Sequence, residues 1–191
     1  MSEYELLKNI CEELQKRGIK ARLLNLNDPE AIGGRIEKIY AVYDPYEGIS
    51  HLGSINIYDR DISQLQVFTR IVPGDISGFR WYDVHFVIRK DPKGKEKNLT
   101  ADCKIGSSLF RRDVKWSGGT LAKQLNSDEE LKKIIKSINC PHRIRPDNQY
   151  KCVRIVLPMG RDESKDIRKI PPKIAESFKA FEKIAKYINQ Y

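Results

Sequence analysis

Apolar residues recur at helical spacing near both ends of this chain and alternate with polar residues in between. Residues 3–17 place an apolar side chain every three to four positions, and Gly18 follows as a stop. Similar stripes follow Thr120 and run from Pro171 to the C-terminus, whereas 79–89 alternates as a strand does. The pattern predicts an α+β fold, with a mainly antiparallel sheet of about six or seven strands packed by N-terminal, middle and C-terminal helices.

The boundaries of these elements follow from local signals. Ser127 and Glu130 have the spacing of a capping box for the middle helix. No shift in composition marks a linker, so we expect residues 1–191 to form a single domain. We expect strands at 19–26, 35–43, 54–59, 64–72, 79–89, 98–106 and 150–158, and a further strand near 109–116.

Charge is distributed unevenly along the chain. Its formal net charge is +9, yet residues 1–60 carry 8 Lys/Arg against 10 Asp/Glu, and residues 61–191 carry 27 against 16. Such an excess of cations predicts a surface that attracts anions. The first hypothesis is therefore a non-enzymatic binding module for an anionic partner, with nucleic acid ahead of anionic lipid or an acidic protein. The residues expected to bind are Arg111, Arg112, Lys115, Arg143, Arg145 and Arg154.

A second hypothesis comes from the segments 79–89 and 98–106, which we expect to pair as a hairpin across the polar loop 90–97. Symmetric pairing would place Asp83 opposite Lys104 and His85 opposite Asp102. Asp83 with Asp102-Cys103-Lys104 resembles the core of PD-(D/E)xK nucleases. The resemblance implies a Mg²⁺-dependent nuclease in which Asp83 and Asp102 hold the metal and Lys104 positions the attacking water.

The same charges have a non-catalytic interpretation. On the solvent face of a hairpin, opposite charges that face each other stabilise the pair of strands without doing chemistry. A third hypothesis is therefore a structural or protein-interaction domain without catalysis. Apart from the Mg²⁺ of the nuclease hypothesis, we expect no cofactor, and the sequence does not indicate an oligomeric state.

The remaining features indicate an intracellular protein. The four cysteines lack a CxxC pair, so we expect free thiols in a reducing cytoplasm rather than disulfides or a zinc site. No apolar stretch approaches the ~20 residues of a transmembrane segment, and the acidic N-terminus does not resemble a secretory signal. His51, between Gly48 and Gly53, is expected in a turn.

Overall fold

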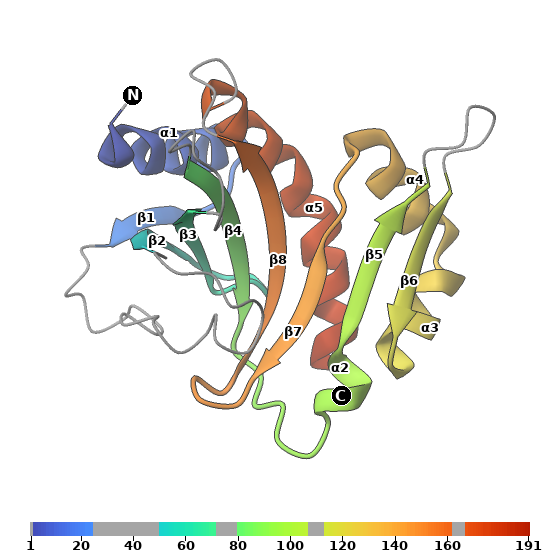
Figure 1. Cartoon of the computed structure of the whole chain (residues 1–191). Coiled ribbons are helices and arrows are strands. Elements are labelled where there is room, and N and C mark those ends of the chain that lie inside the picture. The colour runs from blue at the N-terminus through green and yellow to red at the C-terminus, as the bar shows by residue number, and fades with distance from the viewer. Residues whose placement is uncertain (1, 25–49, 72–79, 107–112, 162–166) are drawn as a thin grey trace.

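One antiparallel sheet carries all the strands that the computed structural model describes (Figure 1). The structure describes residues 2–24, 50–71, 80–106, 113–161 and 167–191. The strand order is β1-β2-β3-β4-β8-β7-β5-β6, and every neighbouring pair is antiparallel. The predicted α+β class is confirmed, with eight described strands in place of six or seven. The predicted strand at 35–43 lies outside the described residues.

Most predicted elements are found close to their expected positions. The strands are β1 (Ala21–Leu24), β2 (Ser50–Ile57), β3 (Gln64–Ile71), β4 (Arg80–Ile88), β5 (Ala101–Ile105), β6 (Val114–Gly118), β7 (Arg143–Asp147) and β8 (Cys152–Arg161). The helices are α1 (Glu3–Lys16), α2 (Glu96–Leu99), α3 (Thr120–Ser127), α4 (Glu129–Ile138) and α5 (Ile170–Asn189), with a short 3₁₀ helix at Ile167–Lys169. None of the helices in these ranges is both long and apolar enough to cross a membrane.

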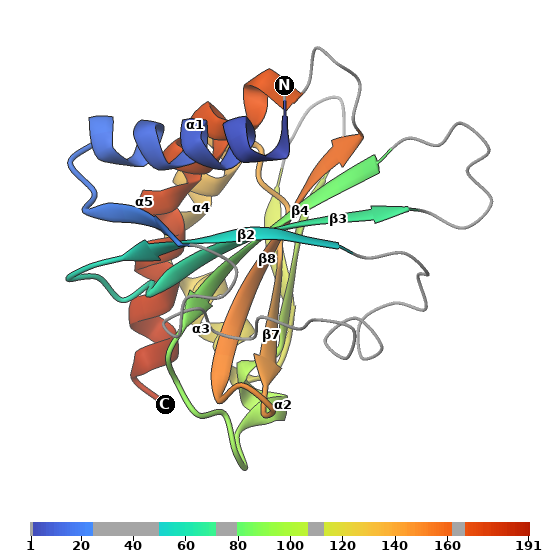
Figure 2. The same cartoon turned by 90° about the vertical axis from the view of Figure 1, so that its left-hand side faces the viewer.

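The core lies between the helices and one face of the sheet. α5 runs behind the sheet in Figure 1, and Figure 2 shows α1 and α5 on the same side of it. Phe86 of β4 meets Phe181 of α5 edge to face, with ring centroids 4.5 Å apart. Burial of this face against the helices is the main favourable term in folding. We call the face that carries Val84, Phe86 and Trp116 the core face.

The middle helices are joined to α5 by one carboxylate. The side chain of Asp128 caps α4 by accepting a hydrogen bond from the backbone N–H of Leu131, at 2.9 Å. It also accepts one from the hydroxyl of Tyr187 on α5 and lies 3.0 Å from the Lys183 ammonium. The predicted capping box at Ser127 and Glu130 is therefore off by one residue, since Ser127 still belongs to α3.

The predicted hairpin between 79–89 and 98–106 is not formed. β8 and β7 lie between β4 and β5 in the sheet, and Asp83 has Phe68 and Pro158 as its strand partners. The segment between β4 and β5 contains α2, and it crosses the places in the sheet that β8 and β7 occupy. β7, which the alternation pattern did not predict, fills one of those positions.

Polar residues line the sheet face that points away from the helices, which we call the polar face. Because side chains alternate along a strand, residues one position from the core residues lie there. On β4 and β8 these are Asp83, His85 and Arg154, and on the other half of the sheet they are Asp102, Lys104, Lys115, Ser117, Arg143 and Arg145. The functional candidates among the described residues therefore share one face of one sheet.

Candidate functional site

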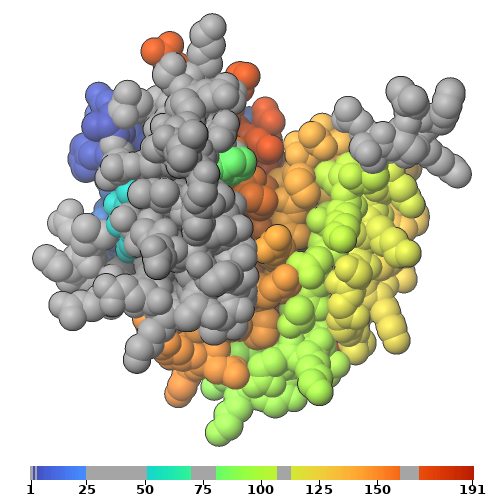
Figure 3. All heavy atoms as spheres, viewed as in Figure 1, coloured from blue at the N-terminus to red at the C-terminus, as the bar shows by residue number. Residues whose placement is uncertain are grey.

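Three exposed cations lie side by side on the polar face of β5, β6 and β7. Lys104 is the direct strand partner of Lys115, and Arg143 is the partner of Asp102, two positions along β5. Lys104, Lys115 and Arg143 are all exposed. In the view of Figure 3, atoms of these three strands form the surface with no helix over them. We call Lys104, Lys115 and Arg143 the cationic patch.

Arg145, on the same face of β7, has its charge compensated. Its Nη2 donates to Asp102 Oδ1 at 2.5 Å, and its Nη1 donates to the carbonyls of Ile144 and Ala101. Such a charge-assisted bond is stronger than one between neutral groups, so this guanidinium is fixed in place. Arg145 and Asp102 thus form an ion pair beside the patch and add little to its net charge.

Arg154 is on the polar face but fully buried. Its Nε donates to Asp147 Oδ2 at 2.8 Å and its Nη1 donates to Gln66 Oε1 at 2.5 Å. Its exposed fraction is 0%, so it cannot contribute to a binding surface without a conformational change. Of the six predicted anion-binding residues, the structure thus brings Lys115 and Arg143 together, pairs Arg145 and buries Arg154. Arg111 and Arg112 lie outside the described residues.

The residues of the nuclease hypothesis are not assembled. Asp83 on β4 and Asp102 on β5 are three strands apart, which corresponds to roughly 14 Å at the usual strand spacing. Lys104 lies opposite Lys115 and not opposite Asp83. Asp83 is also buried, with 5% exposure. The arrangement on which the resemblance rests is therefore absent, because β7 and β8 separate its two halves.

Two histidines flank Phe68 on the polar face. His51 stacks on the Phe68 ring at 5.0 Å between centroids, and His85 lies 4.4 Å from it on the other neighbouring strand. Burial lowers the pKa of His51 to about 4, and burial and the charge of Arg154 lower the pKa of His85. Both imidazoles are therefore neutral at pH 7. His51 belongs to β2, so its expected position in a turn is wrong.

The third histidine has a structural role. His142 Nδ1 donates to the Cys140 carbonyl at 2.9 Å, which leaves Nε2 to accept from the indole N–H of Trp116 at 3.1 Å. Burial lowers the pKa of His142 to about 4. Trp116 is itself buried against the helices, so it offers no exposed ring for stacking on a base.

All four cysteines are buried and carry free thiols. Burial raises the pKa of Cys103 to about 12 and those of Cys140 and Cys152 to about 11. A thiol with so high a pKa is a poor nucleophile. Within the described ranges, no three Cys, His, Asp or Glu side chains are grouped as metal ligands.

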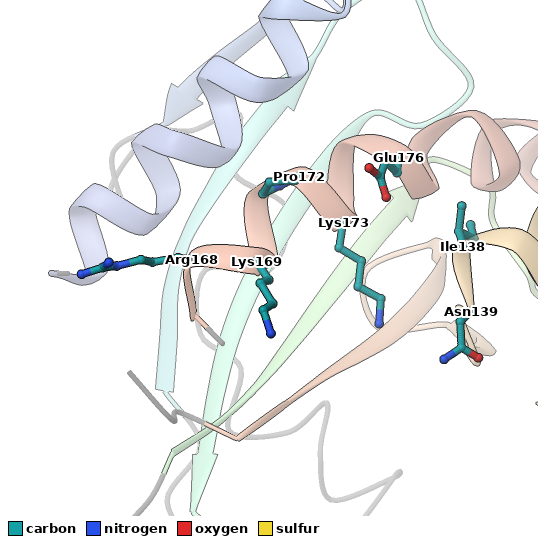
Figure 4. A pocket seen from close by; sticks show the side chains of 7 residues that line it. All are labelled: Ile138, Asn139, Arg168, Lys169, Pro172, Lys173 and Glu176. Carbon is teal, nitrogen blue, oxygen red and sulfur yellow. The ribbon is translucent and has the colours of Figure 1, made fainter. Parts of the chain in front are cut away.

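A cavity of about 430 Å³ lies at the start of α5, on the helical side of the molecule (Figure 4). Lys169, Lys173 and Asn139 point toward the same space, whereas Arg168 extends away from them. Glu176 also lines the cavity and supplies one negative charge. The cavity lies beside the first residues of α5 and apart from the cationic patch, with which it shares no residue.

Comparison with protein-family models, with curated proteins and with solved structures finds no match to this chain.

The polar layer around His51 and Arg154 was not predicted as a unit. A signal for it exists in the sequence, because β2 carries Ser54 and Asn56 and β3 carries Gln64 and Gln66 at alternate positions. These four side chains are buried. Alternating polar residues indicate a solvent-facing strand as readily as a buried polar layer, so the pattern alone does not distinguish the two.

Proposed function

We propose that the protein binds nucleic acid through the cationic patch on β5, β6 and β7. The observation that carries the proposal is the direct pairing of two lysines, Lys104 and Lys115, with Arg143 beside them. Like charges directly opposite each other in a sheet are destabilising, by an amount comparable to the 0.2–1 kcal/mol of a favourable pair. A polyanion that neutralises all three cations would offset this cost.

The kind of contact follows from what surrounds the patch. Of the two acids next to the patch, Asp102 is already held by Arg145, and Asp113 lies exposed at the N-terminal end of β6, two positions before Lys115. The large apolar side chains exposed among the described residues are Tyr4 and Tyr58, and neither lies on β5, β6 or β7. Without an aromatic ring to stack on bases, binding would rest on phosphate contacts and would depend little on base sequence.

The residue types in and around the cationic patch favour nucleic acid over a membrane surface as the partner. Peripheral binding to anionic lipid combines cations with an apolar face that enters the lipid. The described residues of β5, β6 and β7 offer no large exposed apolar side chain that could enter lipid. An acidic protein would contact the same three side chains. Competition between such a protein and an oligonucleotide for the patch shows which of the two binds more tightly.

The test is a comparison of two triple variants by fluorescence anisotropy with a labelled single-stranded oligonucleotide. K104Q/K115Q/R143Q removes the cationic patch. K123Q/K133Q/K136Q removes three exposed lysines from α3 and α4, on the helical side, and so makes the same change in net charge. We expect the patch variant to bind at least tenfold more weakly than the helix variant. Equal affinities would show that net charge, and not this patch, is responsible.

A further inference from the structure

β6 stands at one end of the described strand order, so the backbone on one side of it faces no further strand. Gly106 N–H donates to the Asp113 carbonyl, directly before β6. Gly119 N–H, directly after β6, donates to the Thr100 carbonyl. Because the bonding direction alternates along an antiparallel strand, Trp116, three positions from Asp113 and from Gly119, points its N–H and C=O away from β5. These are the two groups that an added strand would use.

Asn126 of α3 stands in the place of that added strand. Its Oδ1 accepts from the Trp116 N–H at 2.9 Å, and its Nδ2 donates to the Trp116 carbonyl at 2.6 Å. A residue on a neighbouring antiparallel strand makes the same two bonds to the residue opposite it. An amide can do so because it carries a donor and an acceptor side by side. α3 packs next to β6, as Figure 1 shows, and so holds this amide against the edge.

The other end of the described strand order is covered in a similar way. The carbonyl of Lys20, directly before β1, accepts from the Tyr58 N–H. Ala21, the next residue, therefore points its carbonyl away from β2. Gln15 Nε2 of α1 donates to this carbonyl at 2.9 Å. At each end, an amide side chain from a neighbouring helix thus bonds to the outward-facing backbone.

An uncovered edge strand is a template for pairing with another chain. Every described pair of neighbouring strands is antiparallel, and two copies of β6 related by a twofold axis would pair in the same way. The bonds of Asn126 must break before this can happen. Lys115, exposed on β6, opposes the pairing as well, because it would bring the like charges of two cationic patches close together.

We propose that Asn126 closes the outer edge of β6 to strand addition by a second copy of this chain. Loss of the amide leaves the N–H and C=O of Trp116 open to the β6 of another copy, and the two sheets then join edge to edge. Gln15 has the same role at β1, with one bond in place of two. The proposal does not depend on nucleic-acid binding, because the contact is made by the backbone of β6.

The first experiment is sedimentation equilibrium of the full-length wild type, N126A and Q124A over a range of concentrations. Gln124 is the matched control, because it lies two positions away on α3 and accepts from the Tyr191 hydroxyl, not from β6. We expect N126A to dimerise with a Kd at least tenfold lower than those of the wild type and Q124A. Added sodium chloride should tighten the N126A dimer, because it screens the repulsion between the two patches.

Hydrogen exchange at the Trp116 amide, measured by NMR, locates the contact. We expect this N–H to exchange slowly in the wild type and at least tenfold faster in dilute N126A. Exchange in N126A should become slow again as the concentration rises and the second copy of β6 binds the same N–H. If N126A does not fold, N126L, which fills a similar volume without hydrogen-bonding atoms, takes its place.

Three results would overturn the inference. The first is the same association in N126A or N126L as in the wild type. The second is an equally strong dimer in Q124A, which would trace association to loosening of α3. The third is a dimer of N126A in which the Trp116 amide still exchanges fast, since the contact would then lie away from the edge of β6.

Discussion

At the scale of single residues, the cationic patch combines a cost in stability with the gain in binding that we propose. Lys104 faces Lys115 directly across two strands. We predict that K104E stabilises the protein by up to about 1 kcal/mol, because it converts a repulsive pair into an attractive one. The same variant should weaken oligonucleotide binding. Urea denaturation and anisotropy measure the two effects, and a variant that gains both stability and affinity would contradict the role of the patch.

His142 makes the stability of the protein depend on pH. Its pKa is about 4 in the folded protein and near its usual 6.5 when unfolded, so the unfolded chain binds the proton first as the pH falls. The free energy of unfolding should therefore decrease from about pH 6.5 downward, by about 3 kcal/mol for this residue at pH 4.

The check is urea denaturation at pH 7, 6 and 5 for the wild type and H142Q. Glutamine can still accept from the Trp116 indole but does not titrate. We expect the decrease below pH 6.5 to be shallower in H142Q by about 1 kcal/mol per pH unit. The same slope in both proteins would mean that His142 is not buried as described.

The residues of the cationic patch were predictable in part. Lys115 and Arg143 lie on the exposed surface as cations, as expected from the charge distribution. The sequence could not show that Asp102 neutralises Arg145 or that Asp147 and Gln66 enclose Arg154. The partners Asp102 and Gln66 are 43 and 88 positions from the arginines that they contact, and only the strand order brings them together.

At the scale of elements, Asp128 joins the middle helix α4 to α5. It caps α4 and contacts Lys183 and Tyr187 of α5. We predict that D128A lowers the free energy of unfolding by about 1–2 kcal/mol, the usual cost of a lost N-cap. S127A should change it by less than about 0.5 kcal/mol, since that hydroxyl bonds only within α3. If urea denaturation showed a larger loss of stability in S127A than in D128A, Ser127 and not Asp128 would be the cap of α4.

β7 was not predicted because its sequence carries almost no strand signal. β7 is five residues long, and only Ile144 among them belongs to the hydrophobic core. A strand with one core residue has no alternation to recognise. It exists because β8 and β5 supply its hydrogen-bond partners, and its insertion separates β4 from β5. Helices α1 and α5 were predicted closely because each carries a long apolar stripe that is independent of its neighbours.

At the scale of the whole molecule, the reactivity of the four thiols shows whether the core is intact. All are buried, and the raised pKa of Cys103, Cys140 and Cys152 disfavours the thiolate. We predict that a disulfide reagent such as 5,5′-dithiobis(2-nitrobenzoic acid) reacts slowly with the native protein and with four thiols per chain in denaturant. One thiol that reacts rapidly in the native state would place that cysteine at the surface.

The central claim is that one half of the polar face binds nucleic acid through three phosphate contacts. The most direct test is the salt dependence of oligonucleotide affinity for the wild type and K104Q/K115Q/R143Q. Each phosphate contact with a single strand adds about −0.7 to the slope of log K against log salt concentration. The account predicts that the slope of the variant is less steep than that of the wild type by about 2. Identical slopes in the two proteins would contradict it.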